Sequence, residues 1–118
     1  KGEHDVIAFK DKMYKGYVID YDNVGNKMQY YITCNGVLKQ IIDSTGVDTI
    51  TWNHFAMTQN KAADEFKAFC NGVQVGATLN GLAAWIGTGG TYFCENDDTT
   101  LKWDGVVDEC AISNVVRY

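Results

Sequence analysis

The sequence predicts an all-β protein, an antiparallel β-sandwich of short strands. Two Asn-Gly pairs, Asn35-Gly36 and Asn71-Gly72, each stand between runs of β-branched and aromatic residues, and Asn-Gly favours the positive φ angles of a type I′ hairpin turn. The 12 glycines lie largely in closely spaced turn contexts, which indicate short strands. The chain of 118 residues is 46% hydrophobic, which is enough for one core in a single domain.

The first half of the chain contains four candidate strands. Runs rich in β-branched and aromatic residues predict strands at 5–10, 16–21 and 27–33. A fourth strand at 37–42 follows the Asn35-Gly36 turn and completes a hairpin with the third.

The segment 48–59 is predicted as one strand with a change of phase. Ile50 and Trp52 would share one face, whereas Phe55 and Met57 would share the other. Either both faces of this strand are covered, or a bulge interrupts it.

Residues 61–70 admit two interpretations. Their apolar residues recur at helical spacing, and Gly72 stands where a glycine often ends a helix. Alternatively, 65–70 is a strand that Asn71-Gly72 turns into a second strand at 73–79. A helix this short would be nearly alone among strands and marginal without packing. Agreement with the surrounding pattern therefore favours the hairpin.

The last third of the chain predicts short strands at 83–87 and 91–94 and a closing strand at 103–113. On the closing strand, one face would carry Val106, Cys110 and Ile112, so that Cys110 faces a core. The four cysteines are Cys34, Cys70, Cys94 and Cys110. Their spacing fits no zinc motif, and it leaves open whether they are buried thiols or include a disulfide.

Net charge and hydropathy limit the classes of partner. The chain carries a net charge of −5 with a pI near 4.8, and its 10 basic residues are scattered. This distribution argues against a phosphate-binding surface, so no nucleic-acid partner is expected. No apolar run reaches the roughly 18 residues that span a bilayer, so no membrane span is expected.

The stretch ENDDTT (95–100) is the best candidate for a metal or ligand site. Carboxylate and amide oxygens suit calcium, so Glu95, Asp97 and Asp98 are candidate calcium ligands, and the alternative is a solvated turn. Ligand binding is expected from Asn96, Asp97 and Asp98 together with Trp103, whose charged neighbours favour an exposed ring.

Catalysis is not expected. No G-x-S-x-G pattern occurs, and no nucleophile pattern surrounds His54. A retaining glycosidase needs two carboxyl groups about 5–5.5 Å apart. Asp108 and Glu109 would point to opposite faces of a regular strand, so they are not expected to form such a pair.

Four motifs follow one another over residues 52–114: WNHFAMTQN, FKAFCNGVQVG, WIGTGG and WDGVVDECAISN. The ordered set resembles the laminin-G-like, concanavalin A-like jelly-roll modules. The resemblance implies two curved antiparallel sheets and a mostly non-catalytic module that binds glycans or proteins, sometimes with calcium at the rim. Because residues 1–51 match only loosely, we expect 1–118 to be a single but partial domain of a longer chain. The family's first strands would be missing, and sheet edges would be left for other residues to cover.

The resemblance implies a binding module that recognises a glycan or protein ligand through rim loops. The alternative is a structural or decoration domain of a virion or surface filament, whose partners are neighbouring subunits. Either function implies an extracellular, cell-surface or virion location. Fold alone does not assign the ligand.

Overall fold

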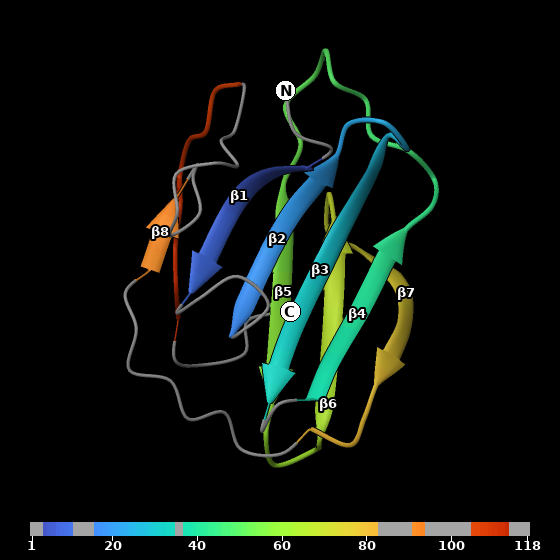
Figure 1. Cartoon of the computed structure of the whole chain (residues 1–118), viewed down its shortest axis with the longest axis vertical. Helices are drawn as coiled ribbons and strands as arrows, with labels where there is room; N and C mark the ends of the chain where they lie inside the picture. Colours follow the sequence, from blue (N-terminus) through green and yellow to red (C-terminus); the bar gives the residue numbers. More distant parts are fainter. Residues whose placement is uncertain (1–3, 11–15, 35–36, 83–90, 94–104, 114–118) are drawn as a thin grey trace.

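The computed structural model describes residues 4–10, 16–34, 37–82, 91–93 and 105–113, which form two antiparallel sheets (Figure 1). The larger sheet has five strands in the order β4-β3-β2-β1-β8, and the smaller has three in the order β5-β6-β7. The strands are β1 (His4–Lys10), β2 (Tyr17–Asp22), β3 (Lys27–Cys34), β4 (Val37–Asp43), β5 (Phe55–Asn60), β6 (Glu65–Cys70), β7 (Val73–Leu79) and β8 (Thr91–Phe93). The prediction of an all-β antiparallel sandwich is confirmed.

Both predicted hairpins are present. Cys34 pairs with Val37, so β3 passes into β4 across two residues. In the second hairpin Cys70 pairs with Val73, and the turn between them has φ 51° at Asn71 and φ 79° at Gly72. These angles fit a type I′ turn. Residues 65–70 are therefore a strand, and the helical alternative is wrong.

The core lies between the two sheets. It contains Ile19, Met28, Tyr30, Ile32, Ile41, Phe66 and Ala68. Two tyrosines also connect the sheets by hydrogen bonds: the Tyr30 hydroxyl donates to the Phe69 carbonyl (3.2 Å), and the Tyr17 hydroxyl donates to Gln59 Oε1 (2.5 Å). The Tyr30 side chain is fully buried, and its hydroxyl needs such a partner.

A bulge in β7 brings its backbone against the larger sheet. The register of β6 with β7 shifts between Phe66 and Ala68, and Gly76 of β7 has φ 66°. A Cβ atom at Gly76 would lie 2.6 Å from Cγ2 of Ile41 in β4. Glycine therefore permits both the left-handed backbone and the close contact between β7 and β4.

The prediction of a strand at 48–59 is wrong for its first part, because β5 begins only at Phe55. Residues 48–54 form turns and irregular backbone, and Ile50 and Trp52 are exposed instead of sharing a packed strand face. Side chains of this segment bind its own backbone groups, which competes with strand pairing.

The closing strand predicted at 103–113 is also wrong for the part that the structure describes, 105–113. Val106, Cys110 and Ile112 are all exposed, so Cys110 does not face a core. Glu109 adopts φ 53°, a left-handed conformation that breaks the extended backbone a strand requires. Cys70 and Cys110 are free thiols, whereas the side chains of Cys34 and Cys94 lie outside the described part. Among the described residues, no helix has the length and apolar character needed to cross a membrane.

Candidate functional site

The predicted site residues Glu95, Asn96, Asp97, Asp98 and Trp103 lie outside the residues that the structure describes. The predictions of calcium binding and of ligand binding by these side chains therefore stay predictions. Within the described ranges, no group of three or more His, Cys, Asp and Glu side chains is placed to hold a metal ion.

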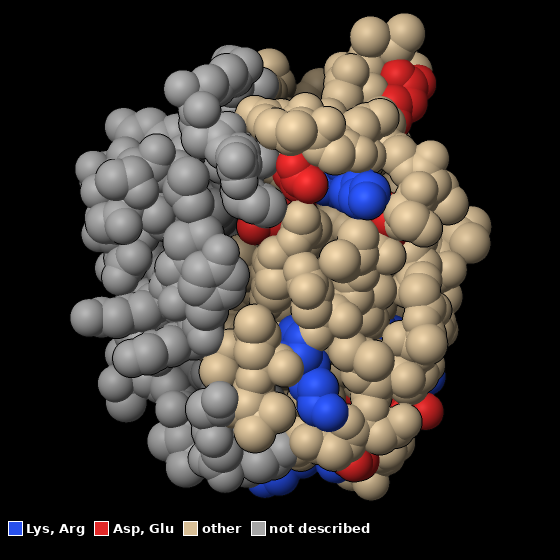
Figure 2. Space-filling view, turned by 45° about the vertical axis from the view of Figure 1, so that its right-hand side comes forward, with Lys and Arg blue, Asp and Glu red and all other residues tan. Residues whose placement is uncertain are grey.

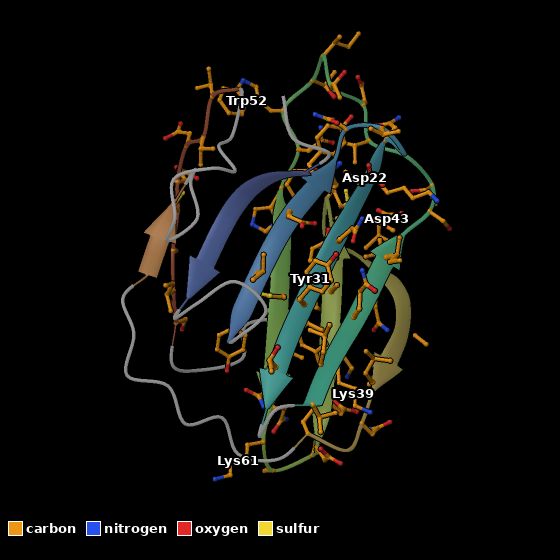
Figure 3. All side chains as sticks on the ribbon, viewed as in Figure 1. Asp22, Tyr31, Lys39, Asp43, Trp52 and Lys61 are labelled. Carbon is orange, nitrogen blue, oxygen red and sulfur yellow. The ribbon has the colours of Figure 1, made fainter. Side chains whose placement is uncertain are left out.

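A loop that leads into β5 exposes two large apolar side chains. We call residues 48–54 the rim loop. Ile50 is 91% exposed and Trp52 is 71% exposed. Figure 3 shows Trp52 at the same end of the molecule as Asp22 and Asp43. Isolated exposed apolar residues are common on protein surfaces, but two on one loop indicate a contact surface if the loop is held in place.

Asp48 fixes the first half of the rim loop. Its Oδ1 accepts a hydrogen bond from the backbone N–H of Ile50 (3.0 Å), and its Oδ2 accepts one from the Thr51 hydroxyl (2.9 Å). The Ile50 N–H, and after it the Thr51 hydroxyl, hold the pKa of Asp48 below its usual range. The carboxylate is therefore ionised at neutral pH.

Asn53 and Asn71 join the rim loop to the β6–β7 turn. Asn53 Nδ2 donates to the carbonyls of Asp48 (2.6 Å) and Thr51 (3.0 Å). Asn71 Nδ2 donates to Asn53 Oδ1 (3.0 Å), while Asn71 Oδ1 accepts from the His54 backbone N–H (2.8 Å). The Asn71 N–H also donates to the His54 carbonyl (2.8 Å). These bonds hold the loop that carries Trp52 against the smaller sheet.

The turn 61–64 at the opposite end of the same sheet is fixed in a similar way. Asp64, at φ 53°, accepts hydrogen bonds from the backbone N–H groups of Gly81 (2.8 Å) and Leu82 (2.7 Å). Asn80 Nδ2 donates to the Asp64 carbonyl (2.8 Å). The N–H of Gly81, followed by that of Leu82, lowers the pKa of Asp64. The exposed residues of this turn are Lys61, Ala62 and Ala63.

The outer side of β4 offers a second surface, next to the buried side chains of Gln29 and Tyr31 in β3. Gln29 Oε1 accepts hydrogen bonds from the Tyr31 hydroxyl and from Gln40 Nε2 (2.7 Å). Leu38 and Ile42 lie on either side of Gln40 in β4 and are about half exposed. Figure 2, which brings the β4 and β7 side forward, shows that uncharged surface covers most of the middle of this side.

Asp20 is a buried carboxyl in β2. Its side chain is fully buried, and it is paired in register with Gln29 of β3. Burial, with a further contribution from the charge of Asp22, raises the pKa of Asp20 to about 7. The protonation of Asp20 therefore changes near neutral pH.

Sequence reasoning missed the rim loop because its apolar residues alternate as in a strand. The available signal was polar: an Asp at 48 and an Asn at 53 bracket Ile50 and Trp52, and such side chains favour turns by binding nearby backbone groups. That signal predicts a turn but does not reveal the partner segment at Asn71.

Comparison with known proteins relates the chain to a viral protein and to a fold family. It is 28% identical over 116 residues to the early transcription factor 82 kDa subunit of fowlpox virus (strain NVSL), an alignment that covers 98% of this chain. The chain spans only 14% of the length of that relative. No solved structure matches. The laminin G model described as the concanavalin A-like lectin/glucanases superfamily matches residues 1–117. The chain therefore belongs to this laminin-G-like, concanavalin A-like family.

Proposed function

We propose that this domain is a non-catalytic binding module that recognises a glycan or protein ligand through the rim loop. The observation that carries the proposal is Trp52, a largely exposed aromatic ring on a loop held by hydrogen bonds to the β6–β7 turn. A loop whose backbone is already held in place loses little conformational freedom when a ligand binds. Large aromatic residues also dominate the binding energy of protein interfaces.

The chemistry of the rim loop favours binding over catalysis. Both carboxylate oxygens of Asp48 accept hydrogen bonds within the loop, so this acid serves to order the backbone. The name of the fowlpox relative describes a transcription factor subunit. Since this chain corresponds to a small share of that protein and carries a net charge of −5, we do not extend a nucleic-acid partner to it.

The test compares two variants on two kinds of probe. Wild-type protein is screened on a glycan array and against a displayed library of random peptides. The best binder is then measured with Trp52→Ala and with Leu38→Ala, a control on β4 that is 47% exposed. We expect Trp52→Ala to weaken binding about tenfold or more and Leu38→Ala less than about twofold. Equal binding by wild type and Trp52→Ala contradicts the proposal.

A structural or assembly function is the second candidate, and the half-exposed Leu38 and Ile42 of β4 favour it. The strand β4 ends the described sheet order, and edge strands with apolar side chains tend to associate. Its partners would be neighbouring subunits of a virion or surface filament. Free thiols at Cys70 and Cys110 are compatible with assembly inside a cell. Sedimentation velocity over a range of concentrations tests this candidate: self-association that Ile42→Lys abolishes supports it, and a monomer throughout contradicts it.

A further inference from the structure

We propose that the ligand of the rim loop is a protein with an apolar pocket and a basic rim, which accepts Ile50 and Trp52 together. The inference rests on the proposed function and makes its ligand specific. The polar side chains of the loop form hydrogen bonds within the protein, whereas its two large apolar side chains are exposed to a partner.

Three polar side chains near Trp52 make hydrogen bonds inside the protein. Asp48 accepts hydrogen bonds through both oxygens. The amides of Asn53 and Asn71 each donate through nitrogen and accept through oxygen, all within the loop and the adjoining turn. A sugar site needs polar groups directed at the ligand's hydroxyls beside the aromatic ring. These amides already make hydrogen bonds inside the protein, so they do not supply such contacts to a glycan.

The two exposed side chains suit a protein pocket better than a sugar ring. Ile50 is almost entirely exposed, and it lies two residues before Trp52. An aliphatic side chain gains from burial in an apolar pocket but has no aromatic face for a sugar. Apolar anchors that enter a pocket, with a tryptophan among them, are typical of binding hot spots.

The charge of this end of the molecule indicates the rim of the pocket. Asp48 is ionised next to the apolar pair, and hydrogen bonds hold its pKa below the usual range. Figure 3 shows Asp22 at the same end as Trp52, whereas Lys39 and Lys61 lie at the opposite end. Lys27 is paired in register with Asp22, and Asp43 is buried. Asp48 is therefore the charge that lies next to the apolar pair. A partner with Lys or Arg around the pocket would be electrostatically complementary.

The test selects a displayed library of small folded domains with randomised surface residues on wild-type protein, with counter-selection on Trp52→Ala. Purified domains from the enriched clones are then measured for affinity by biolayer interferometry. We expect enriched domains to carry apolar residues flanked by Lys or Arg at the randomised positions, and their affinity to fall with added salt. Trp52→Ala should weaken binding about thirtyfold and Ile50→Ser about tenfold. The control Val37→Ser changes a side chain that is 51% exposed at the start of β4, two residues before Lys39 and so at the end of the molecule opposite Trp52. It should change affinity less than twofold.

A parallel glycan array separates failure of this inference from failure of the proposed function. Glycan binding that needs Trp52 but is unchanged by Ile50→Ser overturns the inference and leaves the proposed function in place. If no ligand of either class depends on Trp52, both are overturned. Circular dichroism of each variant checks that the exposed substitutions leave the sandwich folded.

Discussion

The two ends of the three-stranded sheet are fixed by the same chemistry but present different surfaces. At one end Asn71 holds His54 and Asn53 of the rim loop, and at the other Asp64 holds Gly81 and Leu82. The rim loop exposes Ile50 and Trp52, whereas the turn 61–64 exposes a lysine and two alanines. A well-ordered turn is therefore not in itself a binding site. The two turns differ in the exposed side chains that take no part in these hydrogen bonds.

The largest expected effect comes from the strand that both ends share. Phe66 belongs to the core on β6 and is fully buried. Phe66→Ala should lower the free energy of unfolding by about 3–5 kcal/mol and loosen both ends together. Urea denaturation measures the loss, and limited proteolysis reports on each end. A loss under about 1 kcal/mol would show that the two ends do not depend on this core position.

A second prediction concerns pH at Asp20, which is buried in β2 of the larger sheet. Because its folded pKa of about 7 exceeds the ordinary 3.8, the folded state binds a proton that the unfolded state lacks between these values. Asp20 should therefore add stability as pH falls from above 7 towards 4. Urea denaturation across this range measures the slope, and Asp20→Asn should remove that contribution. An identical slope in the variant contradicts the assignment.

A smaller effect is expected at Asn71, and two substitutions separate its roles. Asn71→Gly keeps the positive φ of 51° but loses the side-chain hydrogen bonds to Asn53 and His54. Asn71→Ala loses these hydrogen bonds and also places a residue that disfavours positive φ at this position. We expect a cost of about 1–2 kcal/mol for alanine and less for glycine, measured by urea denaturation. Cleavage by a protease should rise in the rim loop and stay unchanged in the turn 61–64.

The smallest effect is expected at the opposite end, where Asp64 should respond to acid in the other direction. Its folded pKa is lowered by hydrogen bonds from Gly81 and Leu82. The stability that it contributes is therefore complete above the unfolded pKa and is lost as pH falls through the folded pKa. Thermal unfolding between pH 5 and pH 2 should show a shallower decline for Asp64→Asn than for wild type. Equal curves would mean that the hydrogen bonds from Gly81 and Leu82 to Asp64 do not stabilise the fold.

The sequence predicted the parts of this fold that local chemistry determines. The Asn71-Gly72 turn and the alternation of the flanking strands are encoded in a few adjacent residues, and the structure confirms them. The rim loop was not predicted, because Ile50 and Trp52 alternate like strand residues and the deciding contacts to Asn71 are distant in sequence. In 105–113 the alternation was also misleading, since Glu109 leaves the extended conformation. Of the candidate ligand residues, those at 95–98 and 103 remain predictions.

The order of strands in the two sheets has a consequence for how the chain folds. The strands β1 to β4 pair with their neighbours in sequence, and so do β5 to β7. Each sheet can thus assemble from short-range contacts, which generally speeds folding. The exception is β8, which is distant in sequence from its partner β1. During synthesis both hairpin arrays emerge before β8, so this pairing of β1 must wait until residues 91–93 have been made.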